Sequence, residues 1–291
     1  MKVNLKGIMP SISAQDSAHT HHVLDYYAEC WLSRFSDGHN PKSKAMHLGY
    51  FTTDGLSNDD AKLKTNQLIA EILGISKNEN ATIVDLGCGI GGTCVYLAQR
   101  FSNSAFTGVN ISKEQLKFAE HLRSSEGLTE ERIQLELADY AKTSLKSSSS
   151  NYVFALESLC HAQSKESVYA EVHRILADKG VFLFVDYFEI RVPDNREEED
   201  LLNIFRNGWA VSQYIRDHKQ QLLSTGFHSI TEQSLVDHVK PGIDISYETA
   251  IRKLEKNEST DLVRNHLLAC KALKQLVDLE LIDYRYVRCV K

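Results

Sequence analysis

The sequence lacks several features that would assign it to a functional class at once. Its apolar runs are short, and none approaches the roughly 20 residues that a membrane-spanning helix needs, so we predict no membrane span. The net charge is −6 and no basic stripe stands out, which disfavours nucleic acid as a partner. The first 22 residues contain no apolar core of a secretory signal, and we expect a cytoplasmic protein.

The sequence also lacks the paired cysteine spacing of a metal site. Its six cysteines are scattered, at Cys30, Cys88, Cys94, Cys160, Cys270 and Cys289. This usage is typical of reduced thiols, and we predict no metal. With 291 residues, the chain is large enough for one domain with insertions or for a domain with a small cap.

The clearest pattern that is present lies between Ala81 and Phe101. Apolar residues of strand type are closed by Asp85 and Leu86, and four glycines follow at positions 87, 89, 91 and 92. Apolar residues then recur at helical spacing from Cys94 to Phe101. Strand, glycine turn and helix form the opening of an α/β nucleotide-binding unit, in which the helix N-terminus offers free amide donors.

The glycine pattern of this turn is compatible with two kinds of cofactor. The spacing of Gly87, Gly89 and Gly92 also fits the G-x-G-x-x-G pattern of dinucleotide sites. Asp85 distinguishes them, because a carboxylate two residues before the first glycine would repel a pyrophosphate. It suits a ligand that carries an ammonium and a sulfonium group, and we therefore predict S-adenosylmethionine as the cofactor.

The rest of the chain alternates strands and helices. The pattern predicts further strands at residues 105–110, 133–138, 152–156, 181–186, 228–234 and 284–290, the last as an edge strand. This alternation predicts an α/β fold with a doubly wound, mostly parallel seven-stranded sheet. Ligands of such folds bind outside the carboxyl ends of the strands.

The domain organisation is predicted as a cap and a core. Residues 1–78 form an N-terminal helical appendage, and residues 79–291 form the core with lid insertions at about 190–212 and 236–258. Within these insertions, residues 191–200 are expected to be a charged surface connection. Pro241 and Gly242 are expected to lie before a polar helix around residues 248–256.

Three segments resemble a known group of enzymes. Residues 84–92, VDLGCGIGG, resemble motif I of the class I methyltransferases. Residues 155–162, ALESLCHA, with residues 168–174 resemble the sterol C-methyltransferases, and residues 47–51 are similar to an element of the tocopherol methyltransferases. The prenyl-diphosphate C-methyltransferases belong to the same broad group.

The resemblance implies a Rossmann-like methyltransferase fold and methyl transfer from S-adenosylmethionine to carbon of a small, largely apolar, isoprenoid-like molecule. A homo-oligomer is possible. Two alternatives stay open, because one scaffold serves many reactions. One is an O- or N-methyltransferase of a small natural product or amine, and the other is a catalytically silent binding module.

Carried over by position, the resemblance also implies a set of cofactor-binding residues. In this set Asn110 stands where an acid usually holds the ribose, and Asp139 would accept from the adenine amino group. Gln115 either reaches the ribose or only caps a helix. Tyr27 and Tyr50 are expected beside the sulfonium. The full set is Tyr27, Tyr50, Asp85, Gly87, Cys88, Gly89, Asn110, Ile111, Gln115, Ala138, Asp139, Tyr140 and Leu156.

Two candidate catalytic residues follow the fourth predicted strand. We hypothesise that Glu157 is a base or cation stabiliser and that His161, four residues later, assists it. In the alternative, His161 caps a helix and Glu157 only holds the cofactor. Aromatic residues of the appendage and lid suggest an apolar substrate pocket, and they are Tyr26, Tyr27, Trp31, Tyr50, Phe51, Trp209 and Tyr214. Arg34, Lys42 and Lys44 would either hold a diphosphate or form a solvated loop.

Overall fold

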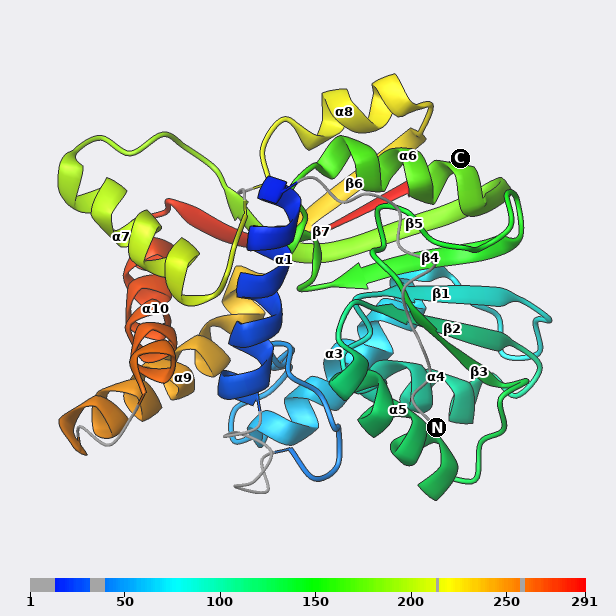
Figure 1. Cartoon of the computed structure of the whole chain (residues 1–291), viewed down its shortest axis with the longest axis horizontal. Coiled ribbons are helices and arrows are strands. Elements are labelled where there is room, and N and C mark those ends of the chain that lie inside the picture. Colours follow the sequence, from blue (N-terminus) through cyan, green and yellow to red (C-terminus); the bar gives the residue numbers. More distant parts are fainter. Residues whose placement is uncertain (1–13, 32–39, 213–214, 257–259) are drawn as a thin grey trace.

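A seven-stranded sheet forms the centre of the computed structural model, which describes residues 14–31, 40–212, 215–256 and 260–291 (Figure 1). The strand order is β3-β2-β1-β4-β5-β7-β6, and β7 runs antiparallel to both of its neighbours. The strands are β1 (Thr82–Leu86), β2 (Ala105–Asn110), β3 (Ile133–Leu137), β4 (Ser150–Leu156), β5 (Leu176–Glu189), β6 (His228–Ser234) and β7 (Ile282–Val290).

The sheet confirms the predicted fold class and corrects one strand. The last strand, β7, was expected at an edge, but it lies between β5 and β6. Its alternating pattern was misleading because some of its polar residues have long side chains that reach neighbouring elements. Arg288, for example, donates from Nε to the carbonyl of Ile72, 3.0 Å away.

Helices cover both faces of the sheet (Figure 1). The central strand β5 shows why two cores form: Phe182 and Phe184 pack into one of them, and Leu183 and Val185 into the other. The helices are α1 (Ala14–Tyr26) continued by the π-helical turn η1 (Tyr27–Trp31), α3 (Asn58–Leu73), α4 (Gly92–Arg100), α5 (Lys113–Ser125), the 3-10 turn η2 (Leu159–His161), α6 (Lys165–Ile175), α7 (Arg196–Gly208), α8 (His218–Thr225), α9 (Val236–Lys256) and α10 (Asp261–Asp278).

Helices α7 and α9 pack on α10 in a helical lobe beside the sheet (Figure 1). Two expectations about this lobe were wrong. Residues 196–200 belong to α7, because Asn195 caps the helix by accepting from the backbone N–H of Glu198 at 3.0 Å. Pro241 does not end a helix: α9 continues through it. Gly242, the next residue of this helix, lies so close to Phe51 that a Cβ atom would be 3.3 Å from the ring.

The N-terminal segment is fixed to the glycine turn. Helix α3 begins at the cap Ser57, which accepts from the N–H of Asp60, and ends at Gly74 in a left-handed conformation. The preceding loop packs tightly on α4, since a Cβ atom at Gly92 would lie only 2.5 Å from the carbonyl oxygen of Lys44. This close approach places residues 44–48 beside the carboxyl ends of the strands. No helix within the described ranges is long and apolar enough to span a membrane.

Candidate active site

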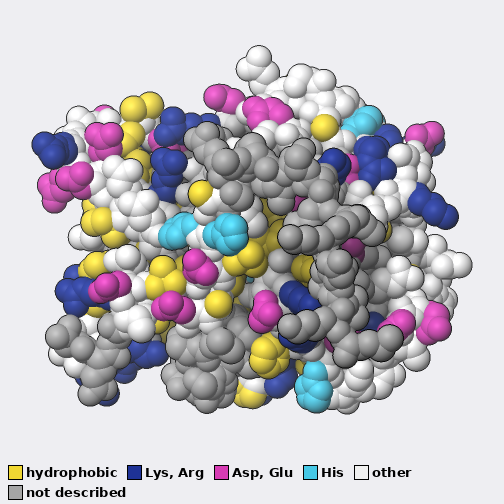
Figure 2. All heavy atoms as spheres, viewed as in Figure 1, with side chains coloured by type: hydrophobic (Ala, Val, Ile, Leu, Met, Phe, Trp, Pro, Cys, Tyr) yellow, Lys and Arg dark blue, Asp and Glu magenta, His cyan; other side chains and the backbone are white. Residues whose placement is uncertain are grey.

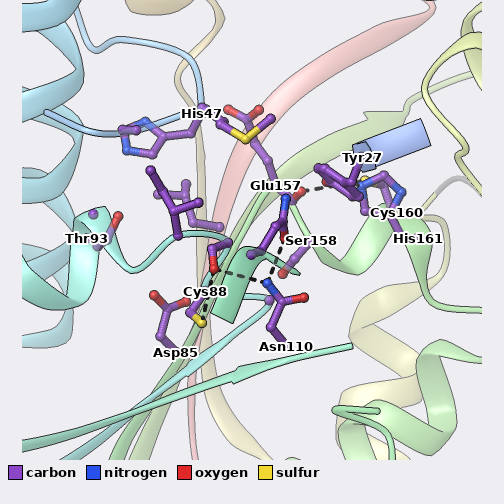
Figure 3. A pocket seen from close by; sticks show the side chains of 18 of the residues that line it. Tyr27, His47, Asp85, Cys88, Thr93, Asn110, Glu157, Ser158, Cys160 and His161 are labelled. Carbon is purple, nitrogen blue, oxygen red and sulfur yellow. Dashed lines mark hydrogen bonds between the residues drawn. The ribbon is translucent and has the colours of Figure 1, made fainter. Parts of the chain in front are cut away.

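A cavity opens where the strand order reverses, between the carboxyl ends of β1 and β4. It encloses about 1130 Å³ of empty space, its open mouth included. Asp85 and Thr93 lie on one side, and Tyr27, Cys160 and His161 lie on the other (Figure 3). Its lining contains these predicted site residues: Tyr27, Asp85, Gly87, Cys88, Gly89, Asn110, Ile111, Gln115, Tyr140, Leu156, Glu157 and His161.

The glycine turn leaves backbone open to the cavity. Gly87 has a φ of +82°, and a Cβ atom there would lie 2.5 Å from the Cβ of Ser158. Gly89 has a φ of +56°, and a Cβ atom there would meet nothing within 4 Å. The turn is therefore tight on its inner side and open on the side where a ligand approaches.

Asp85 is a buried carboxylate whose charge is offset by few hydrogen-bond donors. Its side chain is only 3% exposed, and the thiol of Cys94 donates to Oδ2 at 3.4 Å. Burial raises the pKa of Asp85 to about 7. A cationic group in the cavity would stabilise the charged form, so this end of the cavity suits the ammonium of a methionine-derived ligand.

The amide groups of Asn110 and Gln115 form a pair beside the turn. Asn110 donates from Nδ2 to Gly89 O at 3.1 Å and to Gln115 Oε1 at 2.7 Å. Its Oδ1 accepts from the N–H of Ser112, so Asn110 shapes the turn more than it offers donors to a ribose. Gln115 Nε2 is buried without a partner in the described structure. The open glycine cradle, the uncompensated carboxylate and this amide donor together fit S-adenosylmethionine.

Glu157 accepts hydrogen bonds from three elements at the end of β4. Its carboxylate receives the N–H of Leu48 at 2.6 Å and the hydroxyls of Tyr284 at 2.7 Å and Tyr187 at 3.2 Å. Burial nevertheless raises the pKa of Glu157 to about 7. Its φ of +50° lies in the left-handed region, a strain that proteins retain mainly at functional sites.

The side chain of His161 forms its hydrogen bonds with residues other than Glu157, so the expectation that it assists this carboxylate stays a prediction. Its Nδ1–H donates to the carbonyl of Ala210 at 3.0 Å, which leaves Nε2 to accept from the hydroxyl of Tyr27 at 2.8 Å. Burial lowers the pKa of His161 to about 4, so the ring is neutral. His161 therefore joins the N-terminal segment to Ala210, two residues after the end of α7, and it does not simply cap a helix.

Aromatic rings form a wall next to Glu157. Tyr187 contacts Trp209 edge-on, with ring centroids 5.5 Å apart, and Trp209 stacks on His266 at 5.8 Å. Tyr26 and Tyr27 contact each other edge-on at 5.0 Å. The sequence prediction named Tyr26, Tyr27 and Trp209 among the aromatic residues of a substrate pocket but missed Tyr187, which lies just after the strand predicted at residues 181–186.

The structure places several site candidates elsewhere. Tyr50 does not line this cavity, and its ring packs on His238 with centroids 4.3 Å apart. Ala138 and Asp139 are also outside the lining; Asp139 is exposed and accepts from the N–H of Ala141 at 2.8 Å. Trp31 and Arg34 lie where the structure describes no side chain, and Tyr214 lies outside the described residues. The missed lining residues include Met46, His47, Thr93, Ser158 and Cys160.

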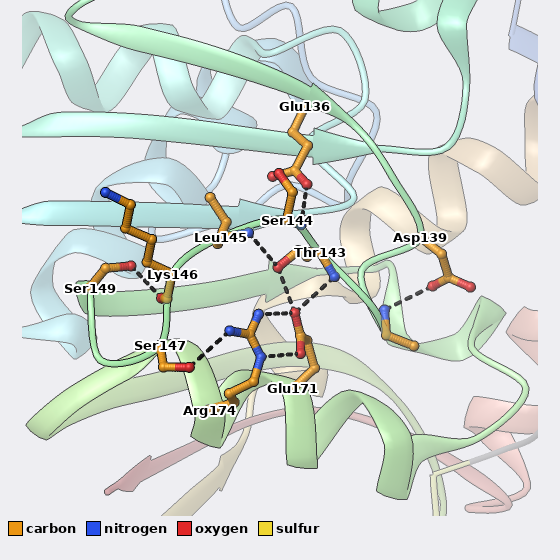
Figure 4. A network of polar contacts seen from close by, with 11 residues as sticks. Glu136, Asp139, Thr143, Ser144, Leu145, Lys146, Ser147, Ser149, Glu171 and Arg174 are labelled. Carbon is orange, nitrogen blue, oxygen red and sulfur yellow. Dashed lines mark hydrogen bonds and ion pairs between the residues drawn. The ribbon is translucent and has the colours of Figure 1, made fainter. Parts of the chain in front are cut away.

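A polar network holds the loop that carries Tyr140 (Figure 4). Glu171 of α6 accepts from the N–H and the hydroxyl of Thr143, at 2.8 and 2.6 Å. Arg174 donates to both oxygens of Glu171, at 2.7 and 2.8 Å. Three residues before Thr143, Tyr140 donates its hydroxyl to Ser158 O at 2.7 Å, so the network positions one wall of the cavity.

We expect Glu171→Ala to destabilise the protein by about 1–3 kcal/mol, because it removes the acceptor of the Thr143 N–H, the Thr143 hydroxyl and two Arg174 donors. Urea unfolding measures the change. Glu120→Ala, on the exposed surface of α5, is the control and should alter stability by less than about 0.5 kcal/mol. Equal effects of the two substitutions would show that the network does not hold the loop.

The outer face of this region combines polar and apolar groups. Hydrophobic and histidine side chains appear together in the middle of Figure 2, where α1 lies in Figure 1. On α1, His21 and His22 are exposed while Val23 and Tyr26 are buried. Because Val23, Tyr26 and Tyr27 line the cavity, the N-terminal helix and its π-helical turn form one of its walls.

Comparison with curated proteins identifies related enzymes of known activity. The sterol 24-C-methyltransferase erg-4 of Neurospora crassa is 28% identical over 180 residues, which are 60% of this chain and 46% of that protein. The sterol 24-C-methyltransferase of Eremothecium gossypii is 24% identical over 78% of this chain and 58% of its own length. The chain spans about half the length of the curated relatives it matches.

Solved structures share the fold over nearly the whole chain. The cyclopropane synthase MmaA2 from Mycobacterium tuberculosis has a TM-score of 0.79 at 17% identity, covering 94% of this chain and 98% of that one. Geranyl diphosphate C-methyltransferase from Streptomyces coelicolor A3(2) has a TM-score of 0.71 at 14% identity, covering 97% and 99%.

The family model that describes a methyltransferase domain matches residues 77–240, more than half of the chain. This range includes the glycine turn, Asp85, Glu157 and the sheet up to β6. The match, the fold and the cavity agree on one assignment. The chain belongs to the methyltransferase domain family, and its cofactor is S-adenosylmethionine.

Proposed function

We propose that this protein transfers a methyl group from S-adenosylmethionine to a carbon atom of a small, largely apolar, isoprenoid-like molecule. The observation that carries the proposal is the setting of Glu157. A buried carboxylate with a pKa raised to about 7 lies against Tyr187, within the same cavity as the glycine turn. A group of this kind is suited to removing a proton near neutral pH.

The proposed roles follow from the chemistry of carbon methylation. S-adenosylmethionine supplies an electrophilic methyl group on a sulfonium. When an alkene carbon bonds to this methyl group, the methyl–sulfur bond would break and S-adenosylhomocysteine would leave. Positive charge would develop on the neighbouring alkene carbon, and the faces of Tyr27, Tyr187 and Trp209 would stabilise it. Glu157 would then take a proton from an adjacent carbon and restore an alkene. Closing the cavity against water prevents capture of the cation.

Segments around the cavity have proposed roles in closing it. We assign the described part of residues 1–78 to a cap, since α1 and residues 44–47 supply lining residues. We assign the insertions at about 190–212 and 236–258 to a lid, because Trp209 after α7 enters the lining and α9 packs near Phe51. In both proposals, His161 holds the parts together through Tyr27 and Ala210.

The relatives support carbon as the acceptor atom. The matched curated proteins are sterol 24-C-methyltransferases, and geranyl diphosphate C-methyltransferase shares the fold. A putative sarcosine dimethylglycine methyltransferase from Galdieria sulphuraria also shares it, with a TM-score of 0.75, 18% identity and coverage of 89% of this chain and 98% of that one. Transfer to an amine therefore remains an outcome that the experiment must distinguish.

The test is incubation with methyl-labelled cofactor and a panel of prenyl diphosphates, sterols, prenylated phenols and small amines, followed by mass analysis. We expect a product that gains one labelled methyl group on carbon. Label found only on nitrogen or oxygen would contradict the proposal. Glu157→Gln serves as the control, and at the same cofactor occupancy it should form the carbon-methylated product about 10²–10⁴-fold more slowly.

A further inference from the structure

Lys44 lines the cavity from a loop that is fixed in place. Its backbone carbonyl lies against Gly92, at the start of α4, so closely that a Cβ atom on Gly92 would be 2.5 Å away. Its own N–H donates to the carbonyl of Asn40 at 3.0 Å, and its φ is +52°. The base of the Lys44 side chain is therefore held next to the helix that follows the glycine turn.

The charge of Lys44 is uncompensated in the described part of the chain. Its neighbour Lys42 forms an ion pair with Asp60 at 2.7 Å, and Lys62 donates to Ala45 O at 3.1 Å, whereas Lys44 has neither kind of partner there. The lining histidines, His47 and His161, are neutral because burial lowers the pKa of each to about 4. Lys44 is thus the cation that the described lining offers to an anion.

The position of Lys44 indicates which anion it binds. An α-amino acid carries its ammonium and carboxylate on one carbon atom, so a site that takes the ammonium at Asp85 needs a carboxylate site close by. The backbone of Lys44 lies against Gly92 at the N-terminus of α4, which also favours negative charge, and Lys44 and Asp85 line the same cavity. We propose that Lys44 binds the carboxylate of the methionine half of S-adenosylmethionine. This inference deepens the proposed function. It rests on that function only in requiring S-adenosylmethionine as the cofactor, whatever the methyl acceptor is.

A phosphate group on the acceptor would present the same anionic chemistry to Lys44. The two possible sources of the anion, cofactor and acceptor, can be distinguished by the nucleoside whose affinity falls when Lys44 is removed. If the cofactor supplies the anion, S-adenosylhomocysteine depends on Lys44 and 5′-methylthioadenosine does not, because it lacks the amino-acid part. If the acceptor supplies the anion, both nucleosides bind equally well without the lysine.

The test is calorimetric titration of Lys44→Met with S-adenosylhomocysteine and with 5′-methylthioadenosine. A charged hydrogen bond is worth about 1.5–3 kcal/mol, so we expect the Kd of S-adenosylhomocysteine to rise about 10–100-fold. The Kd of 5′-methylthioadenosine should stay within about twofold. Lys42→Met, on the same loop but paired with Asp60, is the matched control and should leave both Kd values unchanged. Lys44→Arg should recover most of the lost affinity.

Other outcomes would overturn the assignment in distinguishable ways. Equal weakening of both ligands would show that Lys44 only supports the loop. Unchanged binding of both, with a raised KM for a prenyl diphosphate, would assign the lysine to the acceptor. Unchanged binding and an unchanged KM would remove it from recognition. Because both titrations proceed without methyl transfer, failure to find a methylated product would leave this test intact.

Discussion

Glu157→Gln is expected to lower turnover by about 10²–10⁴-fold, the usual contribution of a general base. The substitution keeps the shape and the acceptor oxygen of the side chain but removes its ability to take a proton. Affinity for S-adenosylhomocysteine should change little, because the proposed ammonium site is Asp85. Single-turnover kinetics with labelled cofactor, together with calorimetry, separate the two effects. Retained turnover would remove Glu157 from the chemistry.

The dependence of turnover on pH is a second test of the prediction that Glu157 is the base. The pKa of Glu157 is raised to about 7 by burial, and only the ionised form can accept a proton. Turnover of the natural protein should therefore rise between about pH 6 and pH 8 and level off above. The residual turnover of Glu157→Gln should not follow this rise.

Tyr187→Phe provides a matched control for the pH profile. It removes a hydroxyl that donates to Glu157 at 3.2 Å but leaves the carboxylate in place. Since hydrogen bonds to a carboxylate stabilise its charged form, the substitution should move the rise in turnover to higher pH. An unshifted profile would show that the observed titration belongs to another group.

Much of the fold was predictable because its signals are local. The glycines from 87 to 92 and the acid before them act on the chain within a few residues. The apolar run of β5 indicated a buried central strand for the same reason, because both of its faces are covered. Alternation of such elements then predicted the parallel part of the sheet.

The remainder depends on contacts between distant segments. Nothing near Pro241 in the sequence shows that α9 runs through it or that the next residue lies against Phe51. Similarly, only the fold shows that His161 meets Tyr27 and Ala210 while Glu157 meets Tyr187 and Tyr284. A strand or helix pattern identifies which residues are buried, but not which side chains meet.

Asp85→Asn should lower the affinity for S-adenosylmethionine by about 10²-fold or more, because removing one partner of a buried charge pair costs about 3–5 kcal/mol. The amide keeps the shape of the carboxylate, so the glycine turn should stay intact. Calorimetry measures the loss, and Asp200→Asn, an exposed carboxylate on α7 outside the cavity lining, is the control. Equal affinities of the Asp85→Asn and natural proteins would show that Asp85 does not bind the ammonium.

The same substitution should stabilise the ligand-free protein at neutral and alkaline pH. Burial raises the pKa of Asp85 from 3.8 to about 7, so the folded state favours the protonated form. The stability that this preference provides is complete below about pH 4 and is lost as the pH rises through about 7. Asp85→Asn has no such titration, and at about pH 8 its free energy of unfolding should exceed that of the natural protein by about 2–4 kcal/mol.

Cofactor affinity should show the opposite dependence on pH, since the charged carboxylate that destabilises the empty cavity is the form that attracts an ammonium. Affinity of the natural protein should rise between about pH 6 and pH 8, and that of Asp85→Asn should stay level over this range. Urea unfolding and calorimetry at matched pH values would test both trends. A gain in stability without a loss of affinity would mean that Asp85 serves the fold alone. Loss of affinity with no gain in stability would mean that the protein already stabilises the charged form of Asp85 when no ligand is bound.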